Sequence, residues 1–111
     1  MLLVLTSEPD GRRFVIDPRA QTALIGRSDP NAKLYVDVDL TGKDGQAFGV
    51  SRRHARVHYI NGHYEMEDVE SLNGTYINGR KMRPYLSEVL HESDEVRLGD
   101  LTLKVSLENV R

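Results

Sequence analysis

The sequence contains no cysteine and no tryptophan among its 111 residues, and it has no long hydrophobic run. Without cysteine there is no disulfide bridge, no thiol nucleophile and no cysteine-ligated zinc, which is compatible with a reducing compartment. The apolar start, Met1–Leu5, is shorter than the roughly 7–15 apolar residues of a secretory signal and the roughly 20 of a membrane span. We therefore expect a cytoplasmic domain that does not bind membranes.

Neither sign of charge dominates the chain. Its 15 lysines and arginines and its 17 aspartates and glutamates give a formal net charge of −2, which excludes a globally basic binder of nucleic acids. The basic residues are nevertheless grouped, because Arg52, Arg53 and Arg56 occur without an acid in residues 51–58, and residues 80–83 hold three more. Few aromatic residues accompany these groups, so stacking on single-stranded nucleic acid is weakly supported. A small basic pocket is more typical of a site for one anionic group.

The length and composition indicate one globular domain. Soluble domains most often have about 100–150 residues, and 39% hydrophobic with 29% charged residues is ordinary globular composition. Turn signals punctuate the whole length, and the runs between them alternate with period two. Such short, evenly spaced strands predict an all-β sandwich or barrel. The signals are Pro9-Asp10-Gly11, Asp17-Pro18, Asp29-Pro30-Asn31, Gly42-Lys43-Asp44-Gly45, Asn61-Gly62, Asn73-Gly74, Asn78-Gly79 and Gly99-Asp100.

Two-residue turns fix the register of the predicted hairpins. A loop of Asn61-Gly62 favours a type I′ turn and places Ile60 opposite His63, so that opposite charges meet on one face and apolar residues on the other. The same arithmetic places Leu98 opposite Leu101 around Gly99-Asp100, and Ile77 opposite Arg80 around Asn78-Gly79.

Three further strand predictions follow from alternation alone. The first pairs the run containing Leu3 and Leu5 with the run containing Phe14 and Ile16. The second is a strand over residues 22–26. The third is a strand over residues 34–40, with Leu34, Val36, Val38 and Leu40 facing inward.

Three loop segments are not explained by strand formation. They are residues 25–28, 49–54 and 68–76, and each carries hydroxyl, amide or guanidinium groups next to glycine. Glycine allows the backbone to approach a ligand closely, and the planar fork of arginine suits phosphate. Together the three segments predict a phosphate or oxyanion pocket built from separate loops.

Each segment also has a simpler interpretation. Gly26-Arg27 and Asn73-Gly74 occur in ordinary turns, and Arg52-Arg53 is commonly a solvated pair. His54 and His58 would lie on one side of a strand, but no further ligands at matching spacing support a metal site. Ser51 near His54 has the residue types of a nucleophile and its base, yet the strand-turn-helix elbow of a hydrolase is absent.

The order of the three segments nevertheless closely resembles the forkhead-associated (FHA) domain. The resemblance rests on Ile25-Gly26-Arg27, Ser51-Arg52-Arg53-His54 and Ser71-Leu72-Asn73-Gly74-Thr75, with Asn78-Gly79 and Leu98-Gly99-Asp100 behind them. It covers the chain from Leu2 to Leu107. It implies an all-β sandwich of two packed, mostly antiparallel sheets over residues 1–111, with ligand loops at one end. Domains of this family are commonly parts of longer proteins, and we expect the same of this single domain.

Members of this family bind phosphothreonine peptides and catalyse nothing, so the resemblance implies a non-enzymatic recognition module without cofactor or metal. Its partner would be a protein phosphorylated by a serine/threonine kinase, and the isolated domain is expected to be a monomer. The implied phosphopeptide-binding residues are Arg27, Ser51, Arg52 and Asn73. Gly26, His54 and Gly74 would support the binding loops. Secondary contacts are expected from Leu72, Asn78 and Arg80, with Lys81 and Arg83 near the rim.

Two departures from the family pattern leave an alternative open. Leu72 stands where many members carry a hydroxyl residue that contacts the phosphate, and the loop around residues 41–50 is long for the family. The alternative is an FHA-type scaffold that associates, or self-associates, without phosphate.

Overall fold

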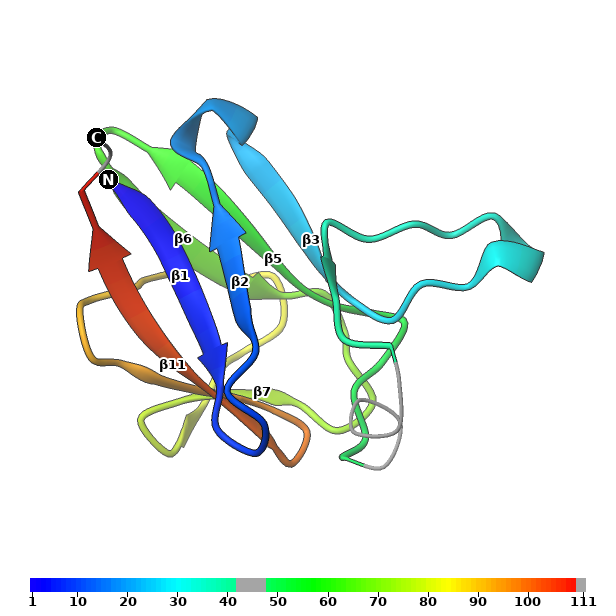
Figure 1. The fold of residues 1–111 in the computed structure, drawn as a ribbon. Helices are drawn as coiled ribbons and strands as arrows, with labels where there is room; N and C mark the ends of the chain where they lie inside the picture. The colour runs from blue at the N-terminus through cyan, green and yellow to red at the C-terminus, as the bar shows by residue number, and fades with distance from the viewer. Residues whose placement is uncertain (42–47, 110–111) are drawn as a thin grey trace.

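The computed structural model describes residues 1–41 and 48–109, which form two β-sheets packed face to face (Figure 1). Two short 3-10 helices, η1 (Pro18–Ala20) and η2 (Pro30–Ala32), lie in connections between strands. The predicted all-β sandwich is therefore confirmed. The strands are β1 (Leu2–Ser7), β2 (Arg13–Ile16), β3 (Thr22–Gly26), β4 (Val38–Asp39), β5 (Arg53–Ile60), β6 (His63–Asp68), β7 (Thr75–Ile77), β8 (Arg80–Lys81), β9 (Glu88–Val89), β10 (Glu95–Leu98) and β11 (Leu101–Glu108).

The first sheet has the strand order β2-β1-β11-β10-β7-β8 and the second has the order β4-β3-β5-β6-β9. All named pairs are antiparallel except β3 with β4. The two inward faces carry the alternating apolar residues, such as Leu5 and Leu103 from one sheet and Ile25 and Met66 from the other, all with no exposed area. Burying each such side chain contributes about 1.5–3 kcal/mol, so this layer is the main source of stability.

The turn chemistry determines the hairpins as predicted. Ile60 faces His63, Leu98 faces Leu101 and Ile77 faces Arg80. Asn61 and Gly62 have φ of 50° and 84°, which both central positions of a type I′ turn require. The N-terminal hairpin and the strand at residues 22–26 are also confirmed.

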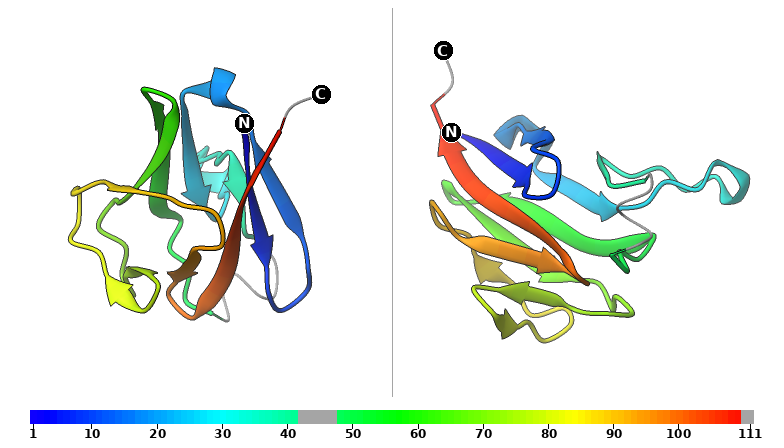
Figure 2. Two further views of the ribbon diagram at one scale, coloured as in Figure 1. Left: turned by 90° about the vertical axis from the view of Figure 1, so that its left-hand side faces the viewer. Right: turned by 60° about the horizontal axis from the view of Figure 1, so that its bottom comes forward.

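The predicted strand over residues 34–40 is mostly wrong. Only Val38–Asp39 forms a strand, because β4 pairs with just the last two residues of β3. Val38 and Leu40 are buried as expected, whereas Leu34 and Val36 are only half-buried. Residues 30–36 instead form an arm that extends away from both sheets (Figures 1 and 2), and Asp37 returns to bond with Leu24 of β3.

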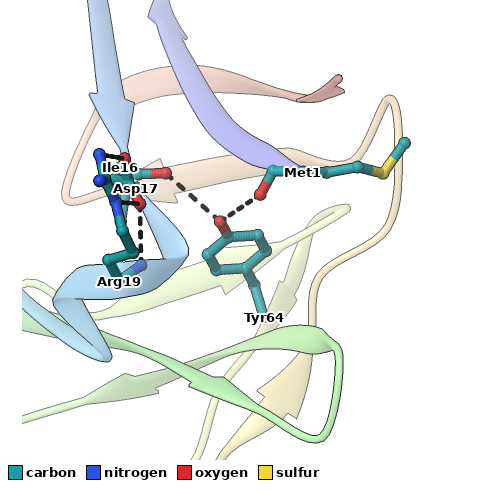
Figure 3. A network of polar contacts seen from close by, with 5 residues as sticks. All are labelled: Met1, Ile16, Asp17, Arg19 and Tyr64. Carbon is teal, nitrogen blue, oxygen red and sulfur yellow. Dashed lines mark hydrogen bonds and ion pairs between the residues drawn. The ribbon is translucent and has the colours of Figure 1, made fainter. Parts of the chain in front are cut away.

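The N-terminus lies at the end of the sandwich opposite the predicted ligand loops. There the Tyr64 hydroxyl donates a hydrogen bond to the Met1 carbonyl at 2.6 Å and lies 3.3 Å from the Ile16 carbonyl (Figure 3). Asp17, next to Ile16, pairs with Arg19 at 2.9 Å. These contacts join β6 to the N-terminus and to the end of β2, and the loops after β3, before β5 and between β6 and β7 lie at the other end.

No helix in residues 1–41 and 48–109 is long and apolar enough to cross a membrane. The expected loop at residues 41–50 lies mostly outside the described residues, which include only Thr41 and residues 48–50 of it.

Candidate functional site

His54 joins two of the loops from inside the sandwich. Its side chain has no exposed area, and its Nδ1 accepts a hydrogen bond from the Ser51 backbone N–H at 2.9 Å. Its Nε2 lies 2.9 Å from the Gly74 carbonyl oxygen, which can only accept, so Nε2 carries the proton. Burial lowers the pKa of His54 below its usual 6.5. The neutral imidazole therefore links the Ser51 loop to the Gly74 loop.

The side of the strand expected for His54 is wrong. The pairing of β3 with β5 shifts between Ile25 and Gly26, where a bulge gives β5 an extra residue. Because of this bulge, His54 and Ala55 are both buried, whereas His58 lies on the outer face and bonds to Glu67 at 2.7 Å. The two histidines therefore do not share a face. Among the residues that the structure describes, no group of three histidine, aspartate or glutamate side chains is placed to hold a metal ion.

Ser51 presents its hydroxyl between two loops. Its Oγ accepts a hydrogen bond from the Leu72 backbone N–H at 3.0 Å. With a donor already on the oxygen, the hydroxyl proton is available to an incoming acceptor. His54 binds the backbone N–H of Ser51 and makes no hydrogen bond to its Oγ, so the arrangement is not that of a serine nucleophile with its base.

Leu72 supplies its backbone to this site. Its side chain is 87% exposed, and its N–H is already bonded to Ser51. The position therefore has neither a side-chain donor nor an unoccupied backbone donor for a ligand.

The two arginines lie on neighbouring backbone segments. The backbone N–H of Arg27 donates to the Arg52 carbonyl at 3.0 Å, and Arg27 Nε donates to the Val50 carbonyl at 2.6 Å. These bonds leave the terminal nitrogens of Arg27 available. The guanidinium of Arg52 is largely exposed and pairs with Asp29 at 3.3 Å.

Gly26 permits this close approach of backbones. A Cβ at position 26 would lie 1.9 Å from the Arg52 carbonyl oxygen, a distance that no side chain can have. The need for glycine here is steric, and it keeps the start of the Arg27 loop against β5.

Asn73 connects the third loop to the second. Its Nδ2 donates to the Gly49 carbonyl at 2.9 Å, which leaves Oδ1 to accept a hydrogen bond. Gly74, the next residue, has a φ of 85°, and its carbonyl also accepts from Gly99 N–H at 2.9 Å. The Gly99 turn, which joins β10 to β11, thus supports the same loop.

Asp68 is an organising residue that was not among the predicted site residues. It is buried (2% exposed), and its Oδ1 accepts hydrogen bonds from the hydroxyls of Ser71 and Thr75, at 2.5 Å and 2.7 Å. Its Oδ2 accepts from the Ser71 backbone N–H at 3.2 Å. The spacing Asp-x-x-Ser at the end of a strand, a pattern of side chain to backbone bonding, is the signal that could have identified it.

Two predicted secondary contacts lie elsewhere. Asn78, in the turn after β7, donates to Asp94 at 2.9 Å and accepts from the Glu95 N–H at 2.9 Å. Arg80 forms an ion pair with Glu88 at 2.7 Å. Both side chains therefore join structural elements of the sandwich and do not meet the other predicted residues.

The arrangement brings together Arg27, Ser51, Arg52 and Asn73 from three loops, with Gly26, His54 and Gly74 beneath them. The sequence model of the FHA domain matches residues 23–99, a span that contains all of these residues. The chain belongs to the FHA domain family.

This FHA domain is similar to longer curated proteins. It is 41% identical over 103 residues to the oxoglutarate dehydrogenase inhibitor of Corynebacterium diphtheriae, covering 93% of the chain and 62% of that protein. It is 39% identical to the glycogen accumulation regulator GarA of Mycolicibacterium smegmatis, covering 92% of the chain and 56% of that protein. The chain thus spans about three fifths of the length of these relatives.

The fold has close structural neighbours. An FHA domain solved in a study of phosphothreonine-dependent FHA domain interactions superposes with a TM-score of 0.77 at 22% identity. The alignment covers 99% of this chain and 100% of that one. The predicted FHA-type sandwich is confirmed.

Proposed function

We propose that this FHA domain binds proteins phosphorylated on threonine and so mediates phosphorylation-dependent interactions in serine/threonine kinase signalling. The observation that carries the proposal is the convergence of Arg27, Ser51, Arg52 and Asn73 at one end of the sandwich. The relatives support a regulatory role, since one is named an inhibitor and another a regulator. In this proposal the domain is cytoplasmic, monomeric and without catalytic activity.

The available donors match the chemistry of a phosphate. A phosphothreonine carries about −1.5 to −2 charges at pH 7 and three strong acceptor oxygens. The terminal nitrogens of Arg27, the Ser51 hydroxyl and part of the Arg52 guanidinium can donate to these oxygens. The Asn73 Oδ1 can accept from a main-chain N–H of the ligand, which fixes the peptide beside the phosphate.

The expected affinity is that of a reversible contact. Each charge-assisted hydrogen bond contributes roughly 1.5–3 kcal/mol net. After the loss of translational and rotational freedom, a few such bonds support about −8 kcal/mol, or a Kd of about 1 μM.

The test compares three peptides of one sequence that carry threonine, phosphothreonine or phosphoserine, titrated calorimetrically. We expect the phosphothreonine peptide to bind at least about 100-fold more tightly than the unmodified one. Arg27→Ala or Ser51→Ala should weaken it by about 10-fold or more, which corresponds to one charge-assisted bond. Arg19→Ala is the matched control, because Arg19 is an exposed arginine paired with Asp17 and distant from the loops.

Equal binding of the phosphorylated and unmodified peptides would contradict the proposal. An association that survives phosphatase treatment and the Arg27→Ala change would instead support the phosphate-independent scaffold, for which the exposed Leu72 is the argument.

A further inference from the structure

Lys81 lies beside the ligand loops, although its neighbour Arg80 does not. Pairing of β8 with β7 places Lys81 opposite Tyr76. The Cε of Lys81 lies 3.1 Å from the position that a Cβ would occupy on Gly74, and Cε2 of the Tyr76 ring lies 3.3 Å from it. The stem of Lys81 therefore packs over Gly74, the residue directly after Asn73.

Two other cations near this loop, Arg52 and Arg97, already have partners. Arg52 pairs with Asp29 at 3.3 Å. Arg97 donates to the Gly99 carbonyl at 2.7 Å, approaches Asp100 at 3.5 Å and stacks over the Tyr76 ring at 3.9 Å from its centroid. Within residues 1–41 and 48–109, no carboxylate lies within 4 Å of the Lys81 ammonium. An incoming acid can therefore pair with Lys81 without displacing an internal partner.

The packing of the Lys81 stem fixes the position of its ammonium group. A lysine whose methylene groups lie against an aromatic ring and a glycine keeps its charged end at the edge of that surface, in water. The ammonium is thus held near the Gly74 loop and remains hydrated. A charge at the rim of a binding site contributes modestly to affinity and mainly selects among ligands.

We propose that Lys81 recognises an aspartate or glutamate side chain of the bound peptide, close in sequence to the phosphothreonine. This inference rests on the proposed function. A peptide whose main chain is held by Asn73 passes next to Gly74, and its flanking side chain then reaches Lys81. The domain would consequently select phosphothreonine sites in an acidic context.

The experiment uses a set of phosphothreonine peptides in which each flanking position in turn is alanine, aspartate or lysine. At one flanking position, we expect the peptide with aspartate to bind the wild-type domain about threefold to fivefold more tightly than the peptide with lysine. This is the range of an exposed ion pair. Lys81→Ala should remove this preference, and Lys81→Glu should invert it. Lys104→Glu is the matched control, because Lys104 is an exposed lysine on the same sheet, opposite Glu95 and away from Gly74.

The outcomes separate the two proposals. If phosphothreonine peptides bind no better than their unmodified twins, the proposed function fails. If they bind but show no acidic preference, or if Lys81→Glu leaves the preference as it was, the inference about Lys81 is overturned. Inversion by Lys81→Glu but not by Lys104→Glu supports it, and circular dichroism checks that both variants are folded.

Discussion

Replacement of His54 by alanine should destabilise the fold and weaken ligand binding together. The imidazole is fully buried and bonds to the Ser51 N–H and the Gly74 carbonyl. Without the ring, the Ser51 N–H loses its partner, which costs about 1–3 kcal/mol. The Gly74 carbonyl keeps its bond from Gly99, so its loss is smaller. With the cavity included, we expect a loss of about 2–4 kcal/mol, a large part of the 5–15 kcal/mol of a typical domain.

The same substitution should change the dependence of stability on pH. Burial lowers the pKa of His54 in the folded state, whereas an unfolded histidine titrates near 6.5. Well above pH 6.5 the residue is neutral in both states. As the pH falls below 6.5, the unfolded state takes up a proton that the folded state resists, so the wild-type domain loses stability. The difference between wild type and His54→Ala should therefore shrink between pH 7 and pH 5.

Urea unfolding at both pH values measures these differences, with tyrosine fluorescence as the signal because the chain has no tryptophan. The affinity for the phosphothreonine peptide is measured alongside. His63→Ala is the control, because His63 is partly exposed and bonds to Glu65 on the outer face. Unchanged unfolding of His54→Ala, or an equal difference at pH 7 and pH 5, would refute the reasoning.

Two further substitutions test single contacts by calorimetry with the phosphothreonine peptide. Leu72→Thr places a hydroxyl at an exposed position that now offers the ligand no donor, and it should tighten binding by about threefold to tenfold, as one added hydrogen bond would. An unchanged affinity would show that the position does not reach the phosphate. Asp29→Asn removes the ion pair of Arg52 but keeps the cap on η2, since asparagine caps as well as aspartate. It should strengthen binding by about twofold to fivefold. The matched control is Asp17→Asn, because Asp17 caps η1 and pairs with Arg19. Equal effects of the two substitutions would mean that only the net charge of the domain matters.

The hairpins could be predicted because their information is local. A two-residue turn fixes the register of both flanking strands, and the alternation of apolar residues then selects one face. The pairs Ile60 with His63 and Leu98 with Leu101 needed nothing beyond their own short segments.

The arm and the bulge could not be predicted, because both depend on distant partners. Residues 34–40 alternate like a strand, but β3 offers β4 only two residues for pairing. The bulge that turns His54 inward arises where β5 meets the end of β3. The local sequence of neither segment contains a signal for the arm or for the bulge.

The predicted site residues divide into two groups for the same reason. The four expected phosphopeptide contacts come from loop motifs that resemble the FHA domain, and of these motifs only Asn73-Gly74 is itself a turn signal. Asn78 and Arg80 were grouped with them because they are near Asn73 in the chain, whereas their actual partners are acids 8 to 17 residues further on. Lys81 reaches the Gly74 loop only through the pairing of β7 with β8.

The contact of Gly26 with the Arg52 backbone has a kinetic consequence. With the Arg27 N–H bonded to the Arg52 carbonyl, the two arginine loops keep a fixed backbone separation before any ligand arrives. Because a preformed site needs no loop closure, we expect the association rate to vary little among ligands, and most ordering falls on the flexible peptide. Differences in affinity among ligands should then arise mainly from differences in the dissociation rate, and so in the lifetime of each complex.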